Sequence, residues 1–330
     1  MIRDSKLTEI QTKENKHIMW MVNDSCPFKC WYCPEDTWGG KSEPSYTWDE
    51  CSEALDVICE HYGRGYFILT GGEPTDWPYY TRVLEKLHNN HNWSVMTVTN
   101  LSKKMDFIDK YVDMNVGICA SYHPNVIRTD KQRKMWLDKL MAVKNRTLMQ
   151  LRIIMDPRHF DHCLELYNSL NDASLFVEPV RVSNFIDGYT PTGVGEGYYT
   201  DKQEAIIDKL ISKVGLDYEK RAGVDPLQST FVYTSGERDT YNSNDAWAAI
   251  TSLNAQRRSK FKGWACEIGL ENLYIDPLGK VAKSVCKGAR KQFISSFKDI
   301  KQTVWPDRPT ICQYEWCFCE PEMLITKKKI

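Results

Sequence analysis

Six short apolar runs alternate with amphipathic segments over the first 180 residues. The apolar runs cover residues 17–22, 66–70, 95–99, 116–120, 148–155 and 174–180. Each run is short and bounded by turn residues, so each predicts a buried β-strand. Because the runs are apolar on both faces, we expect parallel strands that are covered by helices.

Helical segments lie between these strands. They cover residues 47–61, 77–90, 104–112, 130–144 and 158–170. The first begins with a capping-box pattern formed by Thr47 and Glu50. Strands and helices that alternate at about 30 residues per unit predict an α/β fold. Six units instead of eight predict an open, partial (βα)6 TIM-like barrel.

The pattern changes after the sixth strand. A Gly-, Thr- and Tyr-rich stretch begins at residue 183, and helical segments follow near 201–213 and 245–260. The expected parts are an N-terminal extension (1–16), the barrel (17–182), a linker with helical segments (183–260) and a small cysteine-rich domain (261–330). Lys327, Lys328 and Lys329 are expected to form a solvated tail.

Composition narrows the class of protein. The 330 residues contain 43 Lys plus Arg and 44 Asp plus Glu, so the net charge is −1. This balance excludes a global basic footprint for nucleic acid or anionic membrane, while a local patch stays open. Because the first residues are charged, we expect no signal peptide. The sequence has no apolar run of 18 residues, so we expect no membrane span. We expect a cytoplasmic protein, in which the twelve cysteines more often hold metal than form disulfides.

Three of these cysteines follow the first predicted strand closely. Cys26, Cys30 and Cys33 have the spacing C-x3-C-x2-C. Three thiolates on one loop can bind three irons of a [4Fe–4S] cube and leave the fourth iron open, whereas four cysteines would coordinate every iron. Zinc is the alternative, but zinc favours paired C-x2-C knuckles with a fourth Cys or His nearby. The next cysteine is Cys51, inside a predicted helix.

A second motif follows the second predicted strand. Its sequence is Gly71-Gly72-Glu73-Pro74. The two glycines let the backbone approach a ligand closely, and Glu73 supplies a carboxylate for an ammonium group. Together with the cysteine loop, this motif resembles the GGEP element of the radical S-adenosylmethionine (SAM) superfamily. The resemblance covers roughly residues 17–180.

The resemblance implies a cofactor site and a chemistry. In the superfamily, the amino and carboxylate groups of SAM chelate the open iron of the [4Fe–4S] cluster. Residues 71–74 would hold the amino group, and Tyr32 would lie near the adenine. The reduced cluster would cleave SAM to a 5′-deoxyadenosyl radical, which abstracts hydrogen from a substrate. A reductant such as flavodoxin or ferredoxin is implied.

Further candidates lie at or near the carboxyl ends of the predicted strands, where barrel enzymes bind substrates. For the cofactor they are Asn100, Ser121 and Arg152, and for the substrate they are Cys119, His123 and Glu178. The asparagine is expected to present a polar group to the ribose, and the histidine is a candidate proton carrier. The cysteine is a candidate hydrogen donor to a product radical.

Five cysteines lie in the last fifth of the chain. They are Cys266, Cys286, Cys312, Cys317 and Cys319. The first two are expected to bracket a β-hairpin, whose turn is Asp276–Gly279. This segment resembles the C-terminal auxiliary-cluster domain called SPASM in its seven-cysteine form and twitch in its shorter form. Five cysteines imply one auxiliary [4Fe–4S] cluster, and the sequence does not choose which four bind it. Zinc is the alternative.

The leading hypothesis is a radical SAM oxidoreductase or isomerase that oxidises or rearranges a small molecule, a nucleotide or a modified nucleobase. A peptide-modifying maturase is the alternative with the same chemistry, and the short segment before Cys26 weighs against it. A non-catalytic iron–sulfur electron-transfer protein is the alternative of another class. The GGEP motif argues against an electron carrier, because such a protein needs no cradle for a cofactor.

Overall fold

The computed structural model describes residues 6–13, 16–33, 39–40, 43–91, 93–147, 149–170, 175–182, 199–211, 228–242, 249–250, 253, 258–286, 289, 292–317 and 320–330. Six neighbouring strands of its larger sheet lie in chain order and parallel to one another, and they end at the β7 edge. They are β2 (His17–Asn23), β3 (Tyr66–Gly71), β4 (Ser94–Thr99), β5 (Gly117–Tyr122), β6 (Met149–Ile154) and β7 (Phe176–Val180). The predicted α/β fold with a parallel sheet is confirmed.

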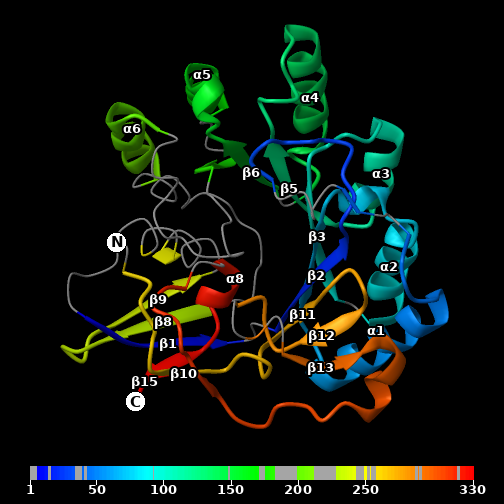
Figure 1. Ribbon diagram of the computed structural model, residues 1–330, viewed down its shortest axis with the longest axis vertical. Helices are drawn as coiled ribbons and strands as arrows, with labels where there is room; N and C mark the ends of the chain where they lie inside the picture. Colours follow the sequence, from blue (N-terminus) through cyan, green and yellow to red (C-terminus); the bar gives the residue numbers. More distant parts are fainter. Residues whose placement is uncertain are drawn as a thin grey trace.

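Helices connect these strands. They are α1 (Trp48–Tyr62), α2 (Tyr80–Lys86), α3 (Met105–Asp113), α4 (Asp130–Val143) and α5 (Phe160–Leu170). Figure 1 shows α1 to α4 in an arc along one side of the parallel strands. The predicted capping box of α1 is confirmed, because the Thr47 hydroxyl accepts from the Glu50 amide at 3.2 Å and the Glu50 carboxylate accepts from the Thr47 amide at 2.7 Å. The segment predicted as one helix over 77–90 is instead α2 followed by a π-helical turn.

The main core lies between the parallel sheet and its helices. Trp20 of β2 is fully buried, and its ring packs against Trp77 at 5.0 Å and Phe297 at 5.4 Å between centroids. Phe297 begins the 3-10 helix η6 (Phe297–Gln302) of the C-terminal part. The C-terminal part therefore shares its apolar core with the parallel sheet.

C-terminal strands extend the same sheet at its β2 edge. They are β11 (Asn272–Ile275), β12 (Lys280–Ala282) and β13 (Phe293–Ser296). β11 pairs in parallel with β2 and antiparallel with β12. The predicted hairpin between Cys266 and Cys286 is confirmed, since the Gly279 amide donates to the Asp276 carbonyl at 3.0 Å. Strand β2 therefore has hydrogen-bonded neighbours on both sides.

A second, antiparallel sheet was not predicted. Its order is β14 (Thr310–Ile311), β10 (Trp264–Cys266), β15 (Lys327–Lys329), β1 (Leu7–Lys13), β8 (Gln228–Tyr233) and β9 (Arg238–Asn242). The expectation of a solvated lysine tail is wrong for Lys327, which is 2% exposed in a strand paired on both sides, whereas Lys328 and Lys329 are exposed. The Lys327 ammonium donates to the carbonyls of Glu322 and Met323 at 2.7 and 2.8 Å, so it has hydrogen-bond partners inside the protein.

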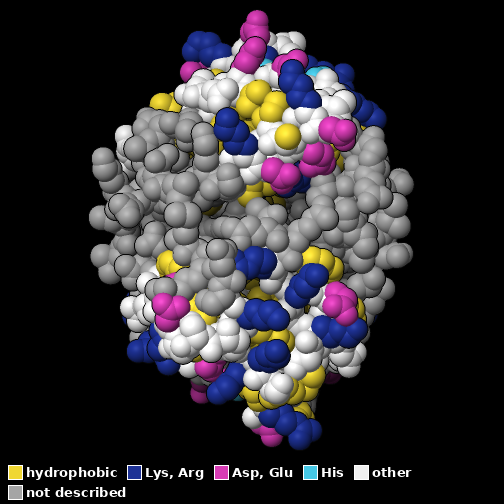
Figure 2. Space-filling model, turned by 90° about the vertical axis from the view of Figure 1, so that its left-hand side faces the viewer, with side chains coloured by type: hydrophobic (Ala, Val, Ile, Leu, Met, Phe, Trp, Pro, Cys, Tyr) yellow, Lys and Arg dark blue, Asp and Glu magenta, His cyan; other side chains and the backbone are white. Residues whose placement is uncertain are grey.

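Charge is unevenly distributed on the surface. Figure 2 shows Lys and Arg side chains gathered in the lower half of the face that it presents, at the height of the antiparallel sheet in Figure 1. A net charge near zero is thus compatible with a local basic surface. Among the described residues, no helix is long and apolar enough to cross a membrane.

Glu271 links the two sheets through hydrogen bonds to Thr326. Its raised pKa makes the stability of the protein depend on pH. Its carboxylate accepts from the amide and the hydroxyl of Thr326, both at 2.7 Å. Burial raises its pKa from the usual 4.5 to about 7, and the charge of Glu267 adds to this shift. The folded state therefore holds the proton more tightly than the unfolded state, so the stabilising contribution is complete below pH 4.5 and is lost as the pH rises to about 7.

Glu271→Gln should remove this pH dependence. Between pH 5.5 and pH 8, we expect the wild type to lose about 2 kcal/mol of unfolding free energy relative to the variant. Urea denaturation at the two pH values measures the difference, and the exposed Glu60→Gln on α1 is the control. If the unfolding free energies of the wild type and of Glu271→Gln change equally between the two pH values, the raised pKa of Glu271 is contradicted.

Candidate active site

The cysteine loop that follows β2 lies at the carboxyl ends of the parallel strands. Cys26, Cys30 and Cys33 line one cavity of about 140 Å³. The remaining lining residues come from the same loop and from the ends of β3, β4 and β5. They are Phe28, Thr70, Gly71, Gly72, Val98, Thr99, Asn100, Ser121 and His123. The structure thus brings the two sequence motifs together at one site.

The cysteine thiols lie in different electrostatic surroundings. Cys26 accepts hydrogen bonds from the Phe28 amide at 3.4 Å and from Asn100 Nδ2 at 3.5 Å, but burial raises its pKa to about 11. Hydrogen bonds from Cys33 and His123 lower the pKa of Cys30 to about 4, against the effect of burial. The Cys30 position therefore favours a thiolate, the form that binds metal.

Two aromatic residues tie the cysteine loop across the edge of the sheet. The Trp31 indole donates to Asp156 at 3.0 Å, and Asp156 follows β6 and is fully buried. The Tyr32 hydroxyl donates to Asn125 Oδ1 at 2.8 Å, just beyond β5. The loop is thus held by residues about a hundred positions away in the chain, which orders the three thiols relative to the strand ends.

Asn23 holds the two glycines against the end of β2. Its Oδ1 accepts from the Gly72 amide at 3.2 Å, and its Nδ2 donates to the Glu73 carbonyl at 3.0 Å. Gly71 has a φ of +145°, a conformation that favours glycine. Gly71 therefore permits a close approach of the backbone to Asn23 of β2, and both glycines line the cavity. Their close approach to a ligand stays a prediction.

Gly71→Ala should destabilise the protein strongly. An added Cβ would lie 2.4 Å from the Asn23 carbonyl oxygen, and backbone at this position cannot move without disturbing both strands. We expect a loss of about 2–3 kcal/mol in unfolding free energy. Gly236→Ala is the matched control, because Gly236 also has a positive φ (82°) but open space around it, so about 1 kcal/mol is expected. Equal losses in the two variants would contradict the steric argument.

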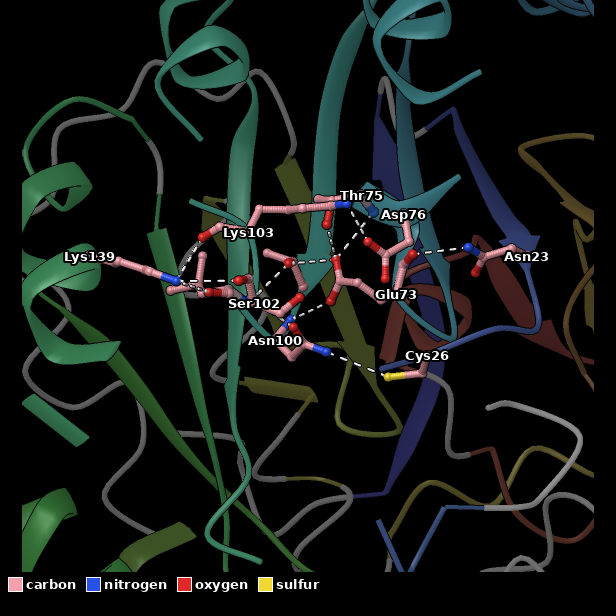
Figure 3. A network of polar contacts seen from close by, with 11 residues as sticks. Asn23, Cys26, Glu73, Thr75, Asp76, Asn100, Ser102, Lys103 and Lys139 are labelled. Carbon is pink, nitrogen blue, oxygen red and sulfur yellow. Dashed lines mark hydrogen bonds and ion pairs between the residues drawn. The ribbon is translucent and has the colours of Figure 1, made fainter. Parts of the chain in front are cut away.

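Glu73 is enclosed by hydrogen bonds and is not among the residues that line the cavity. Its Oε1 accepts from the amide and hydroxyl of Thr75 at 3.2 and 2.6 Å and from the Thr99 hydroxyl at 2.7 Å. Its Oε2 accepts from the Asn100 amide at 2.8 Å (Figure 3). Burial raises the pKa of Glu73. In this structure the carboxylate joins the GGEP segment to the end of β4 and positions Asn100 beside Cys26.

The remaining sequence-predicted residues fall into two groups. Ser121 and His123 line the cavity, and Tyr32 lies directly behind His123 with its hydroxyl 3.0 Å from Nδ1. Outside the lining are Pro74, which begins a 3-10 turn, and Cys119, Arg152 and Glu178 of the neighbouring strands. The last two form an ion pair with 2.9 Å between Nε and Oε2.

Some residues of the site were not predicted. Phe28, Thr70 and Val98 line the cavity, and Asn23 and Asn125 hold its walls. Phe28 lies inside the cysteine spacing and was within reach of a sequence argument. The others read as ordinary strand or turn residues, because only the folded chain places them beside the thiols.

Four of the five C-terminal cysteines converge, and the fifth, Cys319, lies outside the described residues. Burial raises the pKa of Cys266 to about 11 and of Cys317 to about 12, and it raises that of Cys286 well above its ordinary value. Charge on Cys266 and Cys317 adds to the raised pKa of Cys286, and charge on Cys312 adds to the raised pKa of Cys266 and of Cys317. The buried carboxyl of Glu322 and ammonium of Lys327 complete this group.

No group of three or more Cys, His, Asp or Glu side chains within the described part of the chain is arranged to hold a single metal ion. None of the eleven described cysteines forms a disulfide. In a cubic cluster each thiolate binds a different iron, so its sulfurs lie farther apart than the ligands of one ion.

Comparison with known proteins agrees with this geometry. Residues 20–152 match the family model described as the Radical SAM superfamily, whose members use a [4Fe–4S] cluster and SAM. The fold is similar to that of a solved structure of polyhistidine-tagged "anSMEcpe with bound AdoMet", with a TM-score of 0.55 and 13% identity over 87% of this chain and 80% of that one. The comparison with curated proteins gave no match. The match to the Radical SAM family model thus covers residues 20–152, which contain both motifs and most of the parallel sheet.

Proposed function

We propose that this protein is a radical SAM enzyme in which Cys26, Cys30 and Cys33 hold a [4Fe–4S] cluster and SAM binds at the iron that they leave open. The observation that carries this proposal is the cavity in which all three thiols meet Gly71 and Gly72. A three-thiolate donor set on one side and glycine backbone on the other fit a cluster with a chelating cofactor.

The bound cluster would supply one electron to SAM, and the 5′-deoxyadenosyl radical formed would abstract hydrogen from the substrate. The residues of the chain bind and orient the reactants. The Gly71-Gly72 backbone would accommodate the amino group, and Glu73 would support that segment from behind. Asn100, held by Glu73, would face both the cluster ligand Cys26 and the cofactor. Phe28 and Val98 would exclude water from the apolar part of the cavity.

The strands would supply the remaining contacts. We infer that the six parallel strands form a partial (βα)6 barrel, with Ser121 and the ion-paired Arg152 and Glu178 on strands β5 to β7. Ser121 and Arg152 would contact the cofactor, and Tyr32 would lie near its adenine. Glu178 and Cys119 would serve the substrate, the thiol as a hydrogen donor.

The C-terminal cysteines would hold one auxiliary [4Fe–4S] cluster in a SPASM- or twitch-like domain. Cys266, Cys286, Cys312 and Cys317 are the preferred ligands, because electrostatic interactions link their thiols. A bound metal cation deprotonates its thiol ligands, so the raised pKa values of these metal-free thiols are compatible with a metal site. Zinc on the same four residues is the competing outcome.

The reaction class is oxidation or rearrangement of a small molecule, a nucleotide or a modified nucleobase, with a flavodoxin- or ferredoxin-like electron donor in a reducing compartment. The cavity between the cysteine loop and the glycine pair favours catalysis over electron transfer alone. An electron carrier needs no such space next to its cluster.

The full chain, reconstituted anaerobically with iron and sulfide, tests the proposal. Incubation with dithionite and SAM should produce methionine and 5′-deoxyadenosine. An iron-containing protein that leaves SAM intact would instead support the electron-transfer alternative, and a protein that binds only zinc would contradict the proposal.

A further inference from the structure

His123 lies between the cysteine loop and the end of β5. Its Nδ1 is 3.0 Å from the Tyr32 hydroxyl and 3.5 Å from the Cys30 sulfur. Its ring is nearly parallel to that of Tyr32, at 14°, and meets the edge of Phe28 with centroids 5.9 Å apart. Aromatic packing on two sides therefore fixes which ring atom faces Cys30.

The hydrogen-bond partners of Tyr32 determine whether His123 Nδ1 is a donor or an acceptor. The Tyr32 hydroxyl has one proton, and it donates that proton to Asn125 Oδ1 at 2.8 Å. The Tyr32 oxygen is then an acceptor for His123, so Nδ1 carries a hydrogen. The same N–H is within reach of the Cys30 sulfur, which accepts it as a charge-assisted hydrogen bond when the thiol is ionised. This arrangement is the same for the neutral Nδ1–H imidazole and for the imidazolium.

We propose that His123 is a positioning residue that donates a hydrogen bond from Nδ1 to the Cys30 sulfur and so raises the reduction potential of the cluster bound there. This inference rests on the proposed function. A donor to a ligating sulfur stabilises the reduced cluster more than the oxidised one, because the reduced cluster carries one more negative charge. Only an electron is transferred, and His123 keeps its proton.

The Cys26 thiol also accepts a hydrogen bond from a side chain at a strand end, as the Cys30 sulfur does from His123. Cys26 accepts from Asn100 Nδ2 at 3.5 Å, so two of the three candidate ligands receive a side-chain donor from the end of a parallel strand. Asn100 is held by Glu73, and His123 is held by Tyr32 and Asn125. The strand ends thus supply oriented donors to the cluster ligands as well as walls for the cavity.

A redox titration of the reconstituted full chain tests the role of His123. The signal to follow is the electron paramagnetic resonance (EPR) spectrum that changes on addition of SAM, which separates this cluster from an auxiliary one. For His123→Phe, which keeps a ring but removes the donor, we expect about a tenfold lower ratio of reduced to oxidised cluster at a fixed potential. For a one-electron couple this is a midpoint about 59 mV more negative. His123→Gln keeps a donor and should titrate close to the wild type.

His162→Phe is the matched control. His162 also pairs with a tyrosine, its Nε2 lying 2.7 Å from the Tyr122 hydroxyl, but it is on α5 and does not line the cavity. Its midpoint should equal that of the wild type. If His123→Phe retains iron and titrates like the wild type, the role of His123 is contradicted.

Two further outcomes are also decisive. Loss of iron from His123→Phe with retention in His123→Gln would support the hydrogen bond, since a replacement donor restores the ligand. Loss of iron from both variants, with retention in His162→Phe, would overturn it. A wild-type protein without iron would contradict the proposed function itself, and the two failures are therefore distinguishable.

Discussion

Alanine at Cys26, Cys30 or Cys33 is expected to reduce formation of 5′-deoxyadenosine to the uncatalysed background. Each substitution removes one of the three proposed ligands, and the two remaining thiolates would not hold the cluster in the orientation that leaves one iron facing Gly71 and Gly72. Because enzymes exceed the uncatalysed rate by at least about 10⁶-fold, the loss should reach the detection limit. Chromatographic quantification of 5′-deoxyadenosine after anaerobic incubation with dithionite measures it.

Cys163→Ala is the matched control for these variants. Cys163 is a fully buried cysteine on α5 whose thiol donates to the Ile154 carbonyl at 3.3 Å, away from the cavity. It should cost some stability, as removal of a buried group does, while iron content and activity per folded protein stay unchanged. Activity that survives in any of the three loop variants would show that the loop does not bind the catalytic cluster.

Alanine at Cys286 or Cys317 is expected to remove about half of the iron and to spare the SAM-binding cluster. A protein with two [4Fe–4S] clusters binds about eight irons, and the variants should retain about four. The EPR signal that responds to SAM should persist, because Cys286 and Cys317 are not among the residues that line the cavity of the first cysteine group. Iron analysis and EPR spectra of the reconstituted variants measure both effects.

Zinc analysis separates the alternatives at this second site. If the wild type binds about four irons and one zinc, and Cys317→Ala loses only the zinc, the C-terminal cysteines form a structural zinc site. If Cys317→Ala leaves both metals unchanged, Cys317 is not a ligand and Cys319 becomes the candidate. Cys59→Ala on α1, a buried cysteine of the main core, should change neither metal.

The parallel sheet was predictable because its strands are buried on both faces. All six residues of β5 are buried, so the strand appears in the sequence as a short continuous apolar run. The capping box at Thr47 and the turn at Asp276–Gly279 are local patterns whose hydrogen bonds form within four residues. Such patterns do not depend on the rest of the fold.

The antiparallel sheet as a whole was not predictable, because its strands come from distant parts of the chain apart from the β8–β9 hairpin. Thr12 of β1 and Ser229 of β8 form a hydrogen bond across 217 residues. In the sequence Lys327 is part of a charged run, and its burial depends on the carbonyls of Glu322 and Met323 and on the Phe261 ring. No local pattern indicates such pairing.

The site could be predicted in its residue types and less well in its geometry. The cysteine spacing and the glycine pair are sequence patterns with a chemical meaning, and they do meet in one cavity. Glu73 was expected to face an ammonium group, but its two oxygens accept hydrogen bonds from Thr75, Thr99 and Asn100. The donors come from two different segments, so the direction of the carboxylate depended on tertiary structure.

The open iron can be tested most directly by EPR spectroscopy of the reduced protein without and with SAM. Coordination of the amino and carboxylate groups changes the ligand field of one iron, so we predict a change in the g values of the wild-type cluster. The spectrum of a protein with intact iron content that is identical with and without SAM would contradict a three-thiolate site that binds the cofactor.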